Sequence, residues 1–214
     1  LDQIRHKIVI DSLNYNQKAI FHKVHDAFLI KNSKEIPVVS SKNCEGVLYI
    51  VRNPFDLAVS LKHFFAWGQK KSIDFLLDKN ASLCGSEICG DIQSRQFLGT
   101  WENHYSSWAL QNKIPKLIIK YEDLVSKPLK NFAEIASFLN LSKDKNLIKE
   151  AIKNTSFKKL SAMENNLGGF KENLNKETKF FRSGKVGLGK KVLTELEIEL
   201  IESNFKKTLS KLYT

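Results

Sequence analysis

The sequence predicts an α/β fold in which a parallel sheet is flanked by helices. An apolar strand at 46–52 runs directly into a helical pattern at 53–65, and a second strand at 116–124 is followed by helices at 127–140 and 143–153. Strands that alternate with helices are typical of parallel sheets with right-handed crossovers. Ligands of such sheets bind beyond the carboxyl ends of the strands, so the residues that leave each strand are the first candidates for a site.

The strand at 46–52 and the helix after it carry the clearest local signals. The strand, "GVLYIVR", is a short apolar run rich in β-branched and aromatic residues, which favours a buried strand. Asn53 stands at the N-cap position, and Pro54 stands at the first helical position, where its missing N–H costs nothing. An earlier strand, "KAIFHKVH" at 18–25, is predicted from a weaker pattern.

Apolar spacing predicts two further helices. In 97–112, apolar and aromatic residues recur three and four positions apart: Leu98, Trp101, Tyr105 and Trp108. The last helix opens at Thr194 with a Thr-x-x-Glu capping box completed by Glu197. Its apolar face is predicted to carry Ile198, Ile201, Phe205, Leu209 and Leu212. The segment 168–179 is polar and contains glycine, so it is predicted to be a mobile surface loop.

Composition limits the class of protein. With 214 residues, 42% of them apolar, the chain can bury one substantial core, and residues 1–214 are expected to form a single domain. A net charge of +11 favours anionic partners without choosing among them. We find no apolar run of membrane-span length and no signal-peptide pattern. The three cysteines, Cys44, Cys84 and Cys89, lack a zinc spacing and are expected to be reduced thiols in a cytoplasmic protein, with a Cys84–Cys89 disulfide as the alternative.

Arg52 leaves its strand at the carboxyl end, and Ser60 lies about two turns into the helix that follows. If this helix runs back along the sheet, the guanidinium and the hydroxyl can converge on one anion, which Arg binds through two parallel hydrogen bonds. The alternative is a helix-capping turn with an incidental Arg and a Ser on the helix surface.

Lys23 and His25 are two residues apart, so they would share one side of a strand at 18–25. A neutral imidazole is a suitable base for removing a proton from a hydroxyl near neutral pH. An ammonium beside it can stabilise negative charge on a leaving oxygen. On an exposed strand the same pair needs no function. The other histidines, His22, His63 and His104, show no such pairing and are expected to be structural.

In their order and spacing, these pieces resemble the sulfotransferases that use 3′-phosphoadenosine 5′-phosphosulfate as donor. Five motifs carry the likeness: Lys23-x-His25; Arg52, Pro54, Asp56 and Ser60; Gly99-Thr100-Trp101; Tyr121-Glu122-Asp123; and the segment from Arg182 to Thr194. The likeness runs from about residue 18 to residue 194. It implies a nucleotide-kinase-like, P-loop-related architecture of three layers and a transferase of sulfuryl groups.

The segment "RSGKVGLGKK" at 182–191 fits seven of the eight positions of the phosphate loop G-x-x-x-x-G-K-[ST], but Lys191 stands where that loop needs a hydroxyl for Mg²⁺. The resemblance implies instead that the segment closes over the 3′-phosphate of the donor. Arg182, Ser183 and the backbone N–H groups near Gly184 would be its contacts, since amides on flexible glycines bind an anion without metal. The competing reading is a surface loop that joins two helices.

The resemblance also implies roles for the remaining site residues. Tyr121 would lie by the adenine or its ribose, and three residues would lie against the base: Thr155, Ser156 and Phe157. His25 would take the proton from an acceptor hydroxyl or amine as it attacks sulfur in line. Lys23 would stabilise charge on the bridging oxygen of the leaving 3′-phosphoadenosine 5′-phosphate. No metal is expected.

The sequence departs from the family pattern at two places. The Pro-Lys-Ser-Gly-Thr-Thr-Trp element that wraps the 5′-phosphosulfate is not found in residues 1–214, so we expect the chain to be a portion of a longer protein or to lack an amino-terminal segment, with loss of the activity as the alternative. Ser183 replaces a Lys, and Leu188-Gly189 replace Asp-Trp. These details are closer to bacterial natural-product or carbohydrate sulfotransferases.

The acceptor is expected to be a small molecule or a carbohydrate, and Phe64, Phe65 and Trp67 could form apolar walls for it, or equally belong to the core or to a dimer surface. The oligomeric state is open, a homodimer being one option. Two other classes are alternatives: an ATP- or GTP-dependent phosphotransferase, and a basic module that binds nucleic acid or acidic polysaccharide. The latter needs clustered cations, whereas the lysines are scattered, so no nucleic-acid partner is expected.

Overall fold

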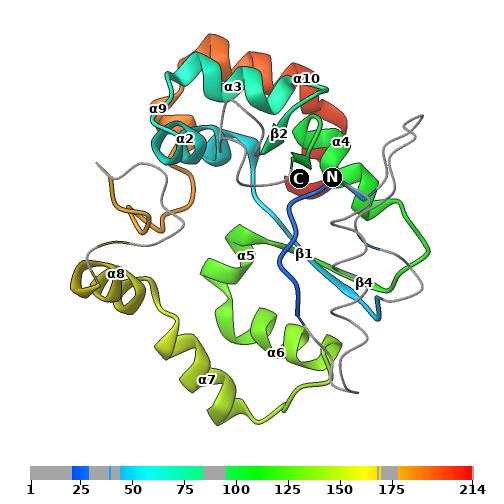
Figure 1. Cartoon of the computed structure of the whole chain (residues 1–214), viewed down its shortest axis with the longest axis vertical. Coiled ribbons are helices and arrows are strands. Elements are labelled where there is room, and N and C mark those ends of the chain that lie inside the picture. Colours follow the sequence, from blue (N-terminus) through cyan, green and yellow to red (C-terminus); the bar gives the residue numbers. More distant parts are fainter. Residues whose placement is uncertain are drawn as a thin grey trace. The chain divides into compact units, whose positions relative to one another are not determined.

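The computed structural model describes residues 21–28, 39, 44–83, 95–167, 169 and 178–213. These residues belong to two compact units, which are treated separately below. The first unit comprises Leu1–Tyr49 and Phe75–Lys116, and the second comprises Ile50–Asp74 and Leu117–Thr214, each so far as it is described (Figure 1). The expectation of a single domain stays a prediction.

Strands β1 (Val47–Val51) and β4 (Lys116–Lys120) are hydrogen-bonded neighbours in a parallel sheet, which confirms the predicted α/β class. The second strand is shorter than predicted, because it ends at Lys120 and Tyr121 begins a helix. Glu122 and Asp123 fall in the first turn of that helix, where carboxylates are favoured by the helix dipole. A separate antiparallel pair joins β2 (Ser82–Leu83) to β3 (Gln96–Phe97).

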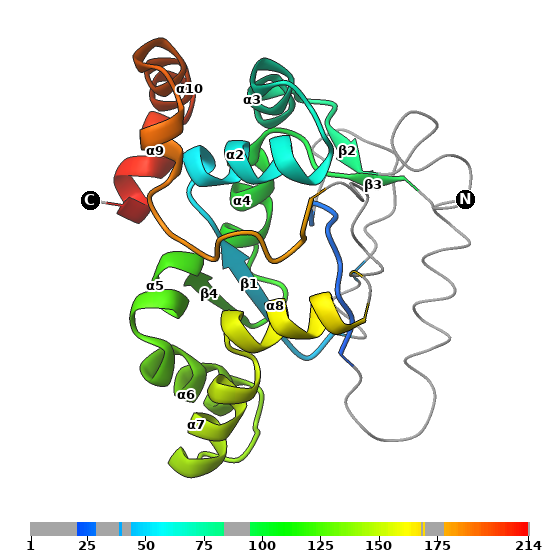
Figure 2. The ribbon, with the colours of Figure 1, turned by 90° about the vertical axis from the view of Figure 1, so that its left-hand side faces the viewer.

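Helices account for most of the second unit. Those in chain order are α2 (Pro54–Phe64), α5 (Tyr121–Ser126), α6 (Pro128–Phe138), α7 (Lys145–Asn154), α8 (Phe157–Asn166), α9 (Gly189–Val192) and α10 (Glu195–Tyr213). Helices α9 and α10 pack against α2, whereas α5 packs on α6 and α6 on α7, and these two groups are apparent in Figure 2. The sequence did not indicate α8, α9 or α3 (Gln69–Leu77).

The predicted caps are present. The Asn53 side chain accepts a hydrogen bond from the Asp56 N–H at 2.8 Å, and Pro54 occupies the first turn of α2. At the start of α10, Glu197 accepts from the Thr194 N–H at 2.9 Å, and the Glu197 N–H donates to Thr194 Oγ1 at 3.4 Å. Both helices therefore begin where the sequence places them.

The first unit has a small aromatic core around helix α4 (Trp101–Ala109), whose N-cap is Thr100. Phe28, Trp108 and Ile114 are buried there, and partly buried apolar residues surround them: Val24, Val39, Cys44, Val47 and Tyr49. The rings of Phe28 and Trp108 lie 4.9 Å apart.

The predicted strand at 18–25 is wrong for the residues that the structure describes, since 21–25 form no strand. Side chains of α4 take up the backbone groups that a strand partner would use. His104 Nε2 donates to the His25 carbonyl at 2.9 Å, and just beyond the predicted strand Trp108 Nε1 donates to the Asp26 carbonyl at 3.0 Å. The alternation argument that put Lys23 and His25 on one face therefore no longer applies.

Within the described part of the chain, no helix combines the length and apolar character needed to cross a membrane. Cys44 is a free thiol whose Sγ lies 3.4 Å from the Gly46 carbonyl, and burial raises the pKa of this thiol. Cys84 and Cys89, and most of the predicted loop at 168–179, lie outside the described residues.

Candidate functional site

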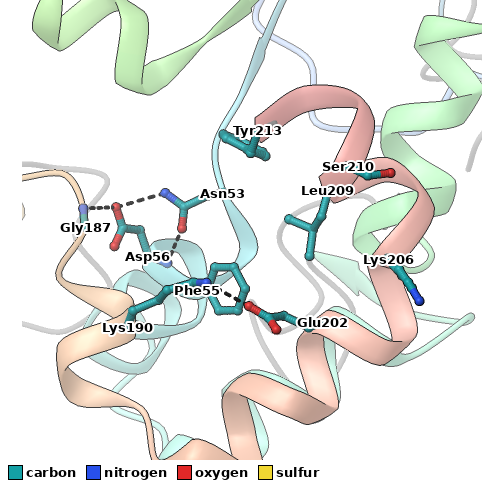
Figure 3. A pocket seen from close by; sticks show the side chains of 10 residues that line it. All are labelled: Asn53, Phe55, Asp56, Gly187, Lys190, Glu202, Lys206, Leu209, Ser210 and Tyr213. Carbon is teal, nitrogen blue, oxygen red and sulfur yellow. Dashed lines mark hydrogen bonds and ion pairs between the residues drawn. The ribbon is translucent and has the colours of Figure 1, made fainter.

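The centre of the site is a buried carboxylate, Asp56, in the first turn of α2. Its Oδ1 accepts the Gly189 N–H at 2.6 Å. Its Oδ2 accepts the Gly187 N–H at 2.8 Å, a contact drawn in Figure 3. Burial acts to raise the pKa of Asp56, but the hydrogen bonds from Gly189, Gly187 and Asn53 and the nearby Arg52 charge outweigh it, so the pKa is lowered. Asp56 thus holds the segment 184–189 against the first turn of α2, just after the carboxyl end of β1. This contact of Asp56 with Asn53, Gly187 and Gly189 is referred to as the clamp.

Arg52 lies between this segment and the end of β4. Its Nη2 donates to the Lys185 carbonyl at 3.3 Å, and its guanidinium lies over the Tyr121 ring, 4.6 Å from the centroid. The distance from Nη2 to Asp56 Oδ2 is 3.9 Å. Guanidinium groups often stack on aromatic rings, and their planar fork of donors suits carboxylate and phosphate oxygens. Two residues predicted to bind the nucleotide, Arg52 and Tyr121, are therefore in direct contact.

Asn53 connects the two strand ends. Its Nδ2 donates to Glu122 Oε1 at 2.6 Å, and its backbone N–H donates to the same oxygen at 3.0 Å. The other Glu122 oxygen accepts from the Tyr213 hydroxyl at 3.4 Å, and burial together with the Glu122 charge raises the pKa of Tyr213. This network fixes the turn after β1 against the start of α5.

Two positions of the segment require glycine, because other parts of the chain lie too close for a side chain. A Cβ on Gly189 would lie 2.2 Å from the Phe55 carbonyl carbon, so only glycine lets this backbone reach α2. Gly184 has φ of +60°, and its Cβ would lie 2.4 Å from Phe157 Cδ2. The ring of Phe157 therefore packs directly on the backbone of Gly184, which brings a predicted base contact to the predicted phosphate segment.

The remaining predicted residues of this unit lie around that contact. Ser60 is half-buried on α2. Ser156 is the N-cap of α8, and the exposed Thr155 just before it donates its hydroxyl to the Ala151 carbonyl at 2.8 Å. Arg182 is exposed, and Ser183 Oγ accepts the Lys185 N–H at 3.4 Å. Burial, reinforced by the charge of Arg182, lowers the pKa of His63.

A run of aromatic rings leads away from Phe157. Phe157 and Phe181 are 6.4 Å apart, Phe181 and Phe180 are 5.0 Å apart, and Phe180 and Phe64 are 6.0 Å apart. Phe64 contacts Phe65, which stacks on Trp67 at 4.3 Å. The turn at 180–181 is held by the buried Glu164, whose carboxylate accepts both N–H groups at 2.6 and 3.0 Å.

A pocket of about 530 Å³ lies between α2 and α10 and is lined in part by Asp56 and Gly187. Figure 3 shows its lining residues: Asn53, Phe55, Asp56, Gly187, Lys190, Glu202, Lys206, Leu209, Ser210 and Tyr213. Lys190 pairs with Glu202 at 2.7 Å, so two of its charges neutralise each other. The pocket shares Asn53, Asp56 and Gly187 with the clamp but contains none of the predicted nucleotide contacts.

The likeness of 184–191 to a nucleotide-hydrolase phosphate loop does not extend to its geometry. In that loop, backbone N–H groups cradle phosphates. Here the N–H groups of Gly187 and Gly189 are given to Asp56. Lys191 lies in the four-residue helix α9, and its N–H donates to the Leu188 carbonyl at 3.1 Å. The phosphotransferase alternative is therefore not favoured.

The predicted catalytic pair lies in the first unit. Lys23 and His25 are exposed residues of an irregular segment. The His25 carbonyl accepts a hydrogen bond from His104 Nε2 at 2.9 Å, and Ala27 N–H donates to the Phe97 carbonyl at 2.8 Å. Hydrogen bonds to main-chain groups therefore hold this segment in place.

Asp56 and Glu122 were not assigned roles from the sequence, although Asp56 stands in the Arg-x-Pro-x-Asp motif, and Asn53 was predicted only as an N-cap. The local signal at Asp56 is a carboxylate in the first turn of a helix, next to an Arg predicted to bind an anion, but a carboxylate that only favours a helix start gives the same signal. Among the described residues, no group of three or more His, Cys, Asp and Glu side chains is arranged to hold a metal ion.

Comparison with known proteins identifies the family. The sulfotransferase domain family matches residues 20–213. Flavonol 3-sulfotransferase of Flaveria bidentis is 29% identical over 206 residues, covering 90% of this chain and 63% of the relative. Cytosolic sulfotransferase 12 of Arabidopsis thaliana is 31% identical, covering 78% and 52%, and sulfotransferase 1B1 of Mus musculus is 28% identical, covering 77% and 54%. The chain thus spans about half to two thirds of the length of these relatives.

Solved structures share the fold. Mouse sulfotransferase SULT7A1 complexed with PAP superposes with a TM-score of 0.62 at 22% identity, covering 85% of this chain and 64% of that one. Retinol dehydratase in complex with androsterone and inactive cofactor PAP gives 0.57 at 21% identity, covering 78% and 48%. The predicted architecture is confirmed by this shared fold. With residues 20–213 matched, the chain belongs to the sulfotransferase family that its motifs predicted.

Proposed function

We propose that this chain carries the nucleotide-binding and catalytic residues of a sulfotransferase that moves a sulfuryl group from 3′-phosphoadenosine 5′-phosphosulfate to a hydroxyl or amine. The observation that supports it best is the grouping of Arg52, Tyr121, Gly184 and Phe157 within one unit, around a loop fastened by Asp56. Family relatives whose names specify sulfotransferases add to this support.

In this proposal, Arg52 and Ser60 bind the 3′-phosphate together with Arg182 and the backbone at Ser183 and Gly184. Asp56 already accepts the Gly187 and Gly189 N–H groups. The phosphate would therefore be bound by the N–H groups that precede them in the loop, near Ser183 and Gly184. The carboxylate contributes by holding the loop in place before the anion arrives, which lowers the ordering cost of binding.

The adenosine would lie against Phe157, beside Tyr121 and the turn formed by Thr155 and Ser156. An exposed ring supplies a flat apolar surface for the base, and Phe157 is 39% exposed. The contact of Phe157 with Gly184 would then couple the base contact to the phosphate contact.

Transfer is proposed to proceed in line. His25 removes the proton from the acceptor as its oxygen or nitrogen attacks sulfur, and Lys23 stabilises charge on the bridging oxygen as the bond from sulfur to that oxygen breaks. The products are the sulfated acceptor and 3′-phosphoadenosine 5′-phosphate. No metal takes part in this scheme.

We further propose a small molecule or a carbohydrate as acceptor, a cytoplasmic location and a bacterial source. The aromatic run at Phe64, Phe65 and Trp67 suits an apolar part of the acceptor. The motif details at Ser183 and Leu188-Gly189 support the bacterial assignment.

A calorimetric titration tests the donor site. The chain should prefer 3′-phosphoadenosine 5′-phosphate over ADP and over ATP with Mg²⁺. Arg52→Ala should weaken that binding by about tenfold to a hundredfold, since a hydrogen bond to a charged group contributes roughly 1.5–3 kcal/mol. Lys130→Ala, which removes an exposed charge on α6, is the matched control. Equal affinity for all three nucleotides, or no effect of Arg52→Ala, contradicts the proposal.

A further inference from the structure

A chain of hydrogen bonds in the first unit ends on the main chain of His25. The Tyr49 hydroxyl lies 2.7 Å from His104 Nδ1, and His104 Nε2 lies 2.9 Å from the His25 carbonyl oxygen. Tyr49 belongs to β1 and His104 to α4, so two regular elements supply the contacts. The rings of Tyr49 and His104 also lie 5.7 Å apart.

The chemistry of the partners fixes the direction of these bonds. A carbonyl oxygen only accepts, so His104 Nε2 carries a hydrogen and donates it to His25. In the neutral ring, Nδ1 then has a lone pair and accepts the Tyr49 O–H. Burial lowers the pKa of His104 against the opposing pull of its bond to His25 and of Asp26, which keeps the ring neutral near pH 7.

Neutrality at His104 matters for a base nearby. A charged imidazolium would repel the positive charge that His25 acquires when it takes up a proton, so it would oppose the action of His25 as a base. A neutral ring holds the backbone of His25 without this electrostatic penalty. The Tyr49 hydroxyl favours the required tautomer of His104, as its O–H needs a lone pair at Nδ1.

The same stretch is fixed immediately after His25. Trp108 Nε1 donates to the Asp26 carbonyl at 3.0 Å, and the Phe97 N–H donates to Asp26 Oδ1 at 3.3 Å. Trp108 and Phe97 thus hold Asp26, and the bond from His104 holds the carbonyl of His25 directly before it.

We propose that Tyr49 and His104 are positioning residues, which hold the peptide of His25 so that its imidazole is presented in one orientation to the acceptor. This inference rests on the proposed function, because it gives His25 the role of base. It assigns a task to two side chains for which the family motifs quoted above give none.

Three variants test the pair. His104→Leu removes both hydrogen bonds, His104→Gln keeps an amide N–H and an amide oxygen, and Tyr49→Phe removes one hydroxyl. The first readout is the ring resonance of His25 in ¹³C-histidine spectra, assigned with His25→Ala. Wild type should give one sharp line, His104→Leu a broadened or split line, and His104→Gln an intermediate result. Nucleotide affinity should stay within about twofold of wild type in all three.

The second readout is turnover with the donor and 2-naphthol as acceptor. We expect kcat to fall about a hundredfold in His104→Leu, the scale of a misplaced catalytic group, and about fivefold in Tyr49→Phe. The KM for the donor should not change. His104→Gln should recover part of the lost kcat, which a merely space-filling role of the ring would not produce.

The two hypotheses fail in different ways. If His104→Leu and Tyr49→Phe leave the His25 resonance single and sharp, the positioning role is wrong, whatever the activity. If His25→Ala retains wild-type turnover, the base assignment under the proposed function is wrong, while the resonance still decides on the pair. Should His104→Leu fail to fold, Tyr49→Phe carries the same decision.

Discussion

The loop at 184–189 and the segment at 25–28 are both irregular in backbone, yet different chemistry holds each of them. The loop donates its N–H groups to an ionised, buried carboxylate, Asp56. The main-chain groups of the segment at 25–28 are held by neutral side chains, His104, Trp108 and Ser107, while the Asp26 carboxylate accepts one hydrogen bond from the Phe97 N–H.

This difference matches the task proposed for each region. A loop that closes on a phosphate gains from being fixed beforehand, and a carboxylate behind it adds strong, charge-assisted hydrogen bonds. A base gains from neutral surroundings, because a nearby charge would shift its pKa. The comparison therefore predicts that the loop depends on the charge of Asp56, whereas the peptides of His25 and Phe28 depend on hydrogen bonds to the neutral side chains of His104 and Ser107.

The largest effect should come from Gly189→Ala. Its Cβ would lie 2.2 Å from the Phe55 carbonyl carbon and 2.5 Å from the Asp56 N atom, so the loop must move away from α2 and lose its bond to Asp56. Overpacking of this kind costs about 1–3 kcal/mol before the lost hydrogen bond is added. Nucleotide affinity, measured by calorimetry, should fall by more than about a hundredfold.

Gly68→Ala is the control for this change, because a Cβ there meets no atom within 4 Å. It should leave both affinity and melting temperature near wild type. Normal nucleotide affinity in Gly189→Ala would show that the contact of the loop with α2 is not needed for binding.

Asp56→Asn should have the next largest effect. The amide keeps the shape, but its NH₂ group must face one of the two glycine N–H donors, which leaves that donor buried and unsatisfied at a cost of about 1–3 kcal/mol. The melting temperature should fall accordingly. Asp74→Asn, which alters an exposed pair with Lys70, is the matched control and should change little.

The pH dependence of the melting temperature of Asp56→Asn tests whether the charge of Asp56 stabilises the fold. The pKa of Asp56 is lowered in the folded chain, so its carboxylate stabilises the fold above the unfolded pKa of about 3.9. That contribution is lost as the pH falls through the folded pKa. The difference in melting temperature between wild type and Asp56→Asn should therefore be full at pH 6 and shrink below pH 4. A difference that does not vary with pH argues against a charged clamp.

A smaller effect is expected at the contact between Gly184 and Phe157. Gly184→Ala places a side chain at φ of +60° and 2.4 Å from the ring, so it should cost about 1–2 kcal/mol and weaken nucleotide binding. Phe157→Ala removes the clash along with the base contact. In a double-mutant cycle by calorimetry, Gly184→Ala should therefore cost less affinity when Phe157 is already Ala. Additive losses of nucleotide affinity would show that Gly184 and Phe157 contribute to binding independently.

The sequence predicted the local parts of the site but not its long-range contacts. The N-cap at Asn53 and the capping box at Thr194 are confirmed, because each depends on residues close together in the chain. The clamp joins Asp56 to glycines 131 and 133 positions away. No local pattern distinguishes such a carboxylate from one that merely favours a helix start.

The failure at 18–25 has the same origin. "FHKVH" alternates as a strand does, but in the described part of this run the His25 carbonyl accepts from His104, 79 positions away. The neighbouring Asp26 carbonyl accepts from Trp108, 82 positions away. Propensity is weak where side chains of another element satisfy the backbone. The roles of His25 and Lys23 stay predictions, since they came from motif order and not from strand geometry.

The smallest effect should follow Ser107→Ala, which tests the neutral side of the comparison. The Phe28 N–H would lose its acceptor at 3.0 Å, at a cost of about 1 kcal/mol and a fall of roughly 2–4 °C in melting temperature. Because no charge is involved, this fall should be the same at pH 5 and pH 8, and nucleotide affinity should stay unchanged. A loss of nucleotide affinity would mean that the base segment and the donor loop are energetically coupled, so that the two regions could no longer be treated as independently stabilised.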